Sequence, residues 1–180
     1  MSRPLLKRLC SRVNPDAAVA LFAKDTPFTR AYVAVRQADS YNGLGGPSSQ
    51  QKLVFDEELL ILGERNADLG GMTVSGAGTT YDLLRWDGSC AALSAGEVTL
   101  RKPPQPKHAN IQWRILSDEI QAAIAKDERT EKLLTDRRKQ CKGVTSGEVT
   151  KACEKTDRAL NDRIAEAVRG GLSIPVPKLP

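Results

Sequence analysis

This sequence is poor in the residues that carry most enzyme chemistry. Its 180 residues include one histidine, His108, and an aromatic fraction of only 4%. Any Ser-His-Asp or Cys-His triad would have to use His108, which lies in a proline-rich stretch without a neighbouring carboxylate to orient the ring. We therefore expect His108 to be exposed and the protein not to be an enzyme.

Nucleotide-binding loops are also missing. The glycines at positions 70, 71, 76 and 78 match neither GxxxxGK(S/T) nor a GxGxxG that opens a helix, because strand-like residues 79–81 follow them. Hairpin turns explain these glycines better. We expect no bound cofactor.

Closely spaced cysteines of the zinc-binding kind, CxxC, are absent. The four cysteines lie at positions 10, 90, 141 and 153, so the gaps are 80, 51 and 12, and we expect no metal site. An even number favours disulfides or buried thiols. We pair Cys141 with Cys153 and Cys10 with Cys90, with two unpaired thiols as the alternative for the second pair.

Long apolar runs are absent as well. No stretch approaches the roughly 18 apolar residues of a membrane span, and the opening residues MSRPLLKRLC lack the apolar centre of a signal peptide. Bridged cysteines require an oxidising compartment. We expect a soluble protein, periplasmic or secreted, in a mature form that begins after its cleavage site; the alternative is a cytoplasmic protein.

The patterns that are present predict an α+β fold, in which a small antiparallel sheet with a short N-terminal helix precedes a C-terminal antiparallel helical hairpin. Asn14-Pro15-Asp16 predicts a helix start, with the helix ending near Lys24. Asp87-Gly88 predicts a two-residue type I′ turn. The expected strands are 29–37, 52–62, 72–75, 81–86, 89–93 and 97–100, and a loop is expected at 41–49. We assign residues 1–100 to the N-terminal arm, helix and sheet.

Asp56, Glu57 and Glu58 form the densest acidic cluster outside the expected helices. Alternation along a strand places Asp56 and Glu58 on one face and Glu57 on the other, which would allow a cation site or an acid/base pair. The simpler interpretation is an edge strand whose charges prevent pairing with other chains. An enzyme that uses these acids is kept only as an alternative.

The last third of the chain predicts two helices after a proline-rich linker. Residues 101–110 are assigned to this linker, 111–171 to the hairpin and 172–180 to an extended tail. The first helix carries Trp113, Leu116 and Ile120 at helical spacing, crosses a polar stretch at 125–132 and continues with Leu134. The segment 145–148, with the sequence TSGE, predicts the start of the second helix as a capping box.

Cys141 falls at the end of the first expected helix and Cys153 on the apolar stripe of the second. With the turn near Val144, Cys153 would lie about two helical turns into its helix, on the order of 10 Å from the turn. A disulfide needs Cα atoms within roughly 7 Å. We therefore expect the bond to form only if the first helix ends before Cys141.

The net charge of +5 is unevenly distributed. Residues 1–15 have four bases and no acid, residues 16–100 have a net charge of −5, and residues 101–108 and 109–180 each add +3. We do not expect nucleic acid as the partner, because the sheet region is acidic. The two tryptophans on which bases could stack, Trp86 and Trp113, are expected in the core. We hypothesise a non-catalytic structural or interaction protein in a larger assembly, with a protein partner or a second copy; the alternative is a nucleic-acid binder. Candidate partner contacts in the arm are Arg3, Lys7, Arg8 and Arg12.

Overall fold

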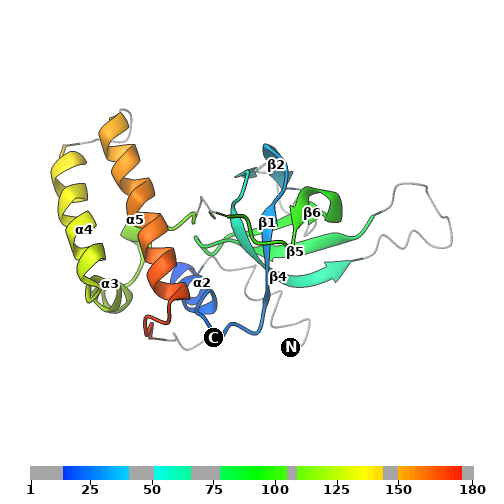
Figure 1. Ribbon diagram of the computed structural model, residues 1–180, viewed down its shortest axis with the longest axis horizontal. Coiled ribbons are helices and arrows are strands. Elements are labelled where there is room, and N and C mark those ends of the chain that lie inside the picture. The colour runs from blue at the N-terminus through cyan, green and yellow to red at the C-terminus, as the bar shows by residue number, and fades with distance from the viewer. Residues whose placement is uncertain (1–13, 41–50, 66–77, 105–108, 144–149, 176–180) are drawn as a thin grey trace.

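The computed structural model describes residues 14–40, 51–65, 78–104, 109–143 and 150–175, and it has the expected α+β fold. Helices gather at one end of the molecule and a curled antiparallel sheet at the other (Figure 1). The elements in chain order are α2 (Pro15–Leu21), β1 (Thr29–Val33), β2 (Gln37–Ser40), β3 (Gln51–Val54), β4 (Glu58–Arg65), β5 (Thr80–Leu84), β6 (Cys90–Ser94), η1 (Ala95–Glu97), β7 (Val98–Thr99), η2 (Trp113–Ile115), α3 (Asp118–Ala125), α4 (Glu128–Gln140) and α5 (Lys151–Arg169).

Helix α2 begins where the sequence predicts. The side chain of Asn14 accepts a hydrogen bond of 3.0 Å from the Ala17 N–H, and Pro15 occupies the first helical position, where no N–H is needed. The helix ends at Leu21, three residues before the expected Lys24.

The five-stranded sheet has the order β6-β5-β4-β1-β7 with every pairing antiparallel, and β2 and β3 form a separate two-stranded sheet. The expected strand 29–37 forms only as β1, and β2, which begins at its last residue Gln37, was not predicted. The expected strand 52–62 is divided into β3 and β4. The break between β3 and β4 lies at Asp56, whose φ of 63° is left-handed. Val33 keeps the sheet joined there, because it donates to Glu57 O at 3.1 Å and accepts from Asp56 N at 2.9 Å.

The sheet has apolar residues on both faces, and each face packs in its own hydrophobic cluster. One face carries Leu60, Leu62 and Leu84 against α2, α3, α4 and α5, in a cluster that also holds Trp86. The other face carries Leu59, Leu83 and Leu93, and Ala38 of β2 and Leu53 of β3 cover it. The β2–β3 hairpin therefore folds over the face that the helices leave open.

The β5–β6 hairpin forms as expected, but its turn is longer than two residues. The last paired residues are Leu84 and Cys90, and within the loop Gly88 donates to Arg85 O at 3.0 Å while Arg85 donates to Ser89 O at 2.9 Å. Gly88 has a φ of +82°, and a Cβ at this position would lie 2.8 Å from the carbonyl carbon of Asn14. Glycine is required here both by conformation and by space.

The first helix of the expected hairpin is broken into shorter pieces. Residues 113–115 form the 3-10 helix η2, Ser117 caps α3, and Asp127 caps α4 by accepting from Thr130 N at 3.0 Å. Capping side chains satisfy the free N–H groups of a helix start, so each of them favours a new helix over a continuous one. Helices α4 and α5 then run antiparallel, and α5 begins at Lys151 after the cap Thr150.

Several expected features lie outside the described residues: the loop at 41–49, the strand at 72–75, the capping box at 145–148, and parts of the linker and tail. Within the described part, none of the helices is long and apolar enough to cross a membrane.

Candidate functional site

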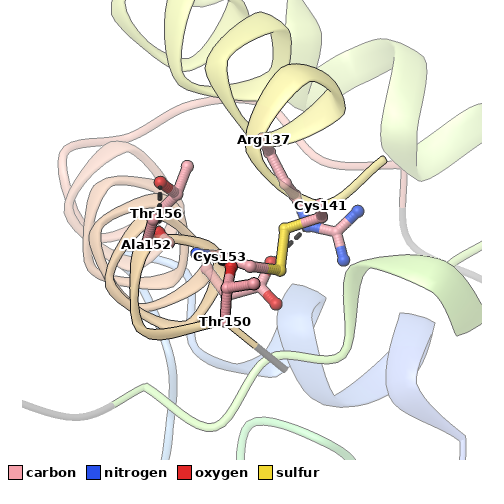
Figure 2. Close-up of a disulfide and its surroundings, with 7 residues drawn as sticks. Arg137, Cys141, Thr150, Ala152, Cys153 and Thr156 are labelled. Atoms are coloured by element: carbon pink, nitrogen blue, oxygen red, sulfur yellow. Dashed lines mark hydrogen bonds and ion pairs between the residues drawn. A yellow bond between two sulfur atoms is a disulfide. The ribbon is translucent and has the colours of Figure 1, made fainter. Parts of the chain in front are cut away.

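The outer end of the α4–α5 hairpin is closed by a disulfide between Cys141 and Cys153, the pair expected from the sequence. Their Cα atoms are 4.9 Å apart. Helix α4 ends at Gln140, so Cys141 is already outside it, as the bond requires. Cys153 lies in the first turn of α5 rather than two turns in, because that helix starts later than expected; the Thr150 hydroxyl accepts from the Cys153 N–H (Figure 2).

The disulfide takes the place of an apolar core at this end of the hairpin. Among described residues beyond Leu134 on α4 and before Leu160 on α5, the buried side chains are Cys141 and Cys153. An ion pair between Arg137 and Asp157 spans the same gap between the helices. Asp157 and both cysteine sulfurs would be close enough to hold a metal ion, but the bonded sulfurs carry no thiolate, so they do not form a zinc-type site.

The inner end of the hairpin is fixed by Asp127 and Arg163. The guanidinium of Arg163 donates to both carboxylate oxygens of Asp127, at 2.7 and 3.1 Å, while Thr130 donates to one of them through N–H and hydroxyl. These hydrogen bonds, with Arg163 the strongest influence, lower the pKa of Asp127 to about 2. The same pairing raises the pKa of Arg163. A helix-capping carboxylate thus also ties α4 to α5.

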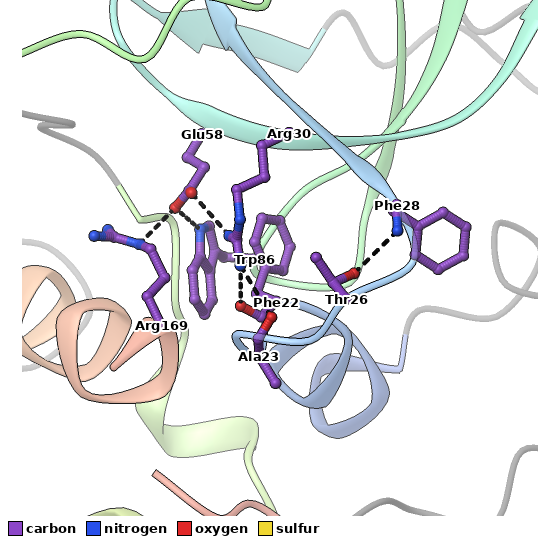
Figure 3. Close-up of polar contacts among 8 residues, drawn as sticks. All are labelled: Phe22, Ala23, Thr26, Phe28, Arg30, Glu58, Trp86 and Arg169. Atoms are coloured by element: carbon purple, nitrogen blue, oxygen red, sulfur yellow. Dashed lines mark hydrogen bonds and ion pairs between the residues drawn. The ribbon is translucent and has the colours of Figure 1, made fainter. Parts of the chain in front are cut away.

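Glu58 is the centre of a buried cluster between the sheet and the helices (Figure 3). Its carboxylate accepts hydrogen bonds from Arg30 of β1 at 2.9 Å and from the Trp86 indole at 3.3 Å. Nε of Arg169, in the last turn of α5, lies 3.0 Å from the same carboxylate as an ion pair, although its N–H does not point at an acceptor. Glu58 therefore connects three elements that are distant in sequence.

The cluster extends into α2 through Arg30 and Trp86. Arg30 donates to the carbonyl oxygens of Phe22 at 2.7 Å and Ala23 at 3.0 Å, which are at the C-terminal end of that helix. The rings of Phe22 and Trp86 stack with centroids 4.0 Å apart. Burial, and next the Glu58 carboxylate, raises the pKa of Tyr32 on the same face.

Glu57 points to the opposite face of the sheet, as alternation predicts. It is 1% exposed, accepts from Arg85 at 2.6 Å and from Val54 N at 3.2 Å. Burial raises the pKa of Glu57, against the opposing effect of Arg85. The glutamates are thus buried and each is paired with arginine.

The interpretation of 56–58 as a charged edge strand is wrong. Strand β4 is the central strand, with β1 on one side and β5 on the other. Asp56 is also buried, at 9% exposure, in the turn that precedes the strand. The sequence located the acids but missed their partners Arg30, Arg85 and Arg169, because these come from β1, the β5–β6 turn and α5, up to 111 positions away.

Asp87 has a structural role in the β5–β6 turn. It accepts from Ser89 N at 2.9 Å and from Asn110 Nδ2 at 2.9 Å. The second contact ties the turn to the chain that enters the helices. Of the two tryptophans, Trp86 is fully buried and Trp113 is half-buried against the same cluster, as expected.

Other residues singled out in the sequence are not all described. Cys90 is disulfide-bonded, while Cys10 lies outside the described residues, so its pairing with Cys90 stays a prediction. Also outside them are His108 and Gly70, Gly71 and Gly76, together with the arm bases Arg3, Lys7, Arg8 and Arg12.

The buried carboxylates therefore connect elements of the fold, and the side chains of the described residues show no arrangement that by itself indicates a particular reaction. Comparison with protein-family models, with curated proteins and with solved structures finds no match to this chain.

Proposed function

We propose that this chain is a non-catalytic interaction protein, an exported component of a larger assembly that contacts a protein partner or a second copy through its α4–α5 hairpin. The observation that carries the proposal is the construction of the hairpin's outer end. A disulfide and the Arg137–Asp157 ion pair hold two helices together where their described residues provide no apolar core. A protruding element stiffened in this way lowers the entropic cost of binding a partner.

The acids support the same proposal. Asp56, Glu57 and Glu58 are the candidates for acid/base catalysis; all three are buried, and Glu57 and Glu58 are each engaged by arginine. An ion pair enclosed in this way fixes the relative positions of the elements and leaves the carboxylate without access to a substrate.

A photo-crosslinking amino acid placed at Ala152 or Ala159 of α5 tests the proposed contact in cells, because both positions are exposed. The matched control is Gly96 in η1, between strands β6 and β7. This residue is exposed, and a Cβ at its position would have no atom within 4 Å. We expect larger crosslinked species from the hairpin positions and few from position 96. Crosslinks absent from the hairpin, or equal at all three positions, would contradict the proposal.

The exported location is tested separately by mass spectrometry of protein alkylated without reduction. We expect no alkylated cysteine before reduction, and four after it. Four thiols that alkylate directly would place the chain in a reducing compartment and would remove the exported part of the proposal.

A further inference from the structure

The outer end of the α4–α5 hairpin is strongly basic. Over residues 137–158 the sequence has seven bases and three acids, a net charge of +4. Arg137 and Asp157 pair with each other and leave six exposed bases against one exposed acid, Glu154, among the described residues of this segment. The six are Arg138, Lys139, Lys142, Lys151, Lys155 and Arg158, called the basic tip below.

Three bases of the basic tip lie on one face of α5. Lys151, Lys155 and Arg158 follow one another at spacings of four and three, and the acid Glu154, four residues before Arg158, lies beside them. That face is turned away from the seam formed by Cys153, Leu160 and Ile164. Among the described residues, no carboxylate forms an ion pair with any base of the tip. The charges are therefore available to an external group.

From this we infer that the basic tip is a docking surface for a polycarboxylate, an acidic segment of a partner protein. The inference rests on the proposed function and names the chemistry of the partner. The disulfide lies beside Lys142 and Lys151 and fixes the two helices that carry the charges. Such preorganised positions suit a partner with carboxylates at fixed sites.

The other polyanions fit the tip less well. Helices α4 and α5 contain no Phe, Tyr or Trp on which the bases of a single-stranded nucleic acid would stack. The exposed large apolar residues of the described chain are Val54, Phe55, Leu100 and Ile115, none of them on the tip, so it offers nothing to insert into a bilayer.

The experiment measures binding of the full chain to poly-L-glutamate, to a random-sequence DNA duplex and to phosphatidylglycerol vesicles. The test variant is K139Q/K142Q/K151Q/K155Q. The control K24Q/K52Q/K102Q/K126Q removes the same charge from exposed lysines elsewhere. Bases of the N-terminal arm are retained in both, so their contribution cancels.

We expect poly-L-glutamate to bind most tightly, to weaken as salt is raised, and to lose roughly tenfold in affinity in the test variant and little in the control. The variant C141S/C153S should weaken this binding several-fold while circular dichroism verifies that it is folded. Tighter binding to DNA or vesicles, or equal losses in the test variant and the control, would overturn the inference. Hairpin crosslinks that persist in the test variant would refute the acidic partner and leave the proposed function standing.

Discussion

Arg169, in the last turn of α5, lies 3.0 Å from the Glu58 carboxylate at the start of the central strand β4. The contact joins the end of the helical hairpin to the middle of the sheet. Arg30 and Trp86 bind the same carboxylate, so one side chain fixes the orientation of helices and sheet. The base of the hairpin is therefore firmly held, which is what a protruding contact surface needs.

Glu58→Gln should lower the free energy of unfolding by about 3 kcal/mol, because it leaves Arg30 and Arg169 without their carboxylate in a buried setting. Chemical denaturation measures the loss. Glu64→Gln, on the same strand but exposed, is the control and should change stability by less than about 0.5 kcal/mol. Equal effects of the two changes would show that the buried cluster does not join helices and sheet.

Gly88→Ala should destabilise the fold by about 2 kcal/mol or more. Alanine is strained at a φ of +82°, and its Cβ would lie 2.8 Å from the Asn14 carbonyl carbon at the start of α2. Gly96→Ala is the control, because its Cβ would meet no atom within 4 Å. Thermal unfolding of both variants measures the difference. A Gly88→Ala protein as stable as Gly96→Ala would show that the turn does not pack on α2.

C141S/C153S should lower stability by roughly 3 kcal/mol, the loop-closure value for a short bridged loop. At the outer end of the hairpin, Cys141 and Cys153 are the buried residues among those described, so their loss should loosen this end first. We therefore expect hydrogen exchange of the backbone amides to become faster mainly at residues 137–141 and 151–157. Amides of α3 serve as the internal reference. Uniform acceleration across all helices would indicate that the bond supports the whole fold instead of the tip.

Asp127→Asn should flatten the acid limb of the stability curve. The pKa of Asp127 is lowered to about 2 in the folded protein, so its pairing with Arg163 contributes stability that is present above about pH 4 and is lost as pH falls toward 2. Asparagine is as good a helix N-cap as aspartate, so this substitution removes the charge and keeps the cap.

Urea midpoints measured between pH 2 and 5 test this expectation. Asp25→Asn removes an exposed carboxylate without breaking an ion pair of the described chain and is the control. An unchanged slope in Asp127→Asn would show that the Asp127–Arg163 contact does not contribute to acid stability.

Features that depend on neighbouring residues could be predicted from the sequence. Asn14-Pro15 starts α2, and Gly88 shapes the β5–β6 turn. The requirement that the first helix stop before Cys141 also follows from helix geometry, and α4 ends at Gln140. The breaks in that helix are not evident from its apolar spacing, because the caps Ser117 and Asp127 lie within a pattern that also fits one continuous helix.

The candidate site depends on how α4 and α5 pack together, because its bases come from the end of one helix and the start of the other. The basic tip does not appear in the net charge of residues 109–180, because acids near the inner end of the hairpin offset the bases near its outer end.

By itself, the sequence determined the α+β class, the start of α2 and the alternation that places Glu57 and Glu58 on opposite faces, because caps, turns and strand periodicity act over a few residues. Only the tertiary structure decided that β4 is central and that its acids are buried against Arg30, Arg85 and Arg169. The strand, turn and helix that carry these partners come together through contacts between distant segments, and no local pattern encodes which segments meet.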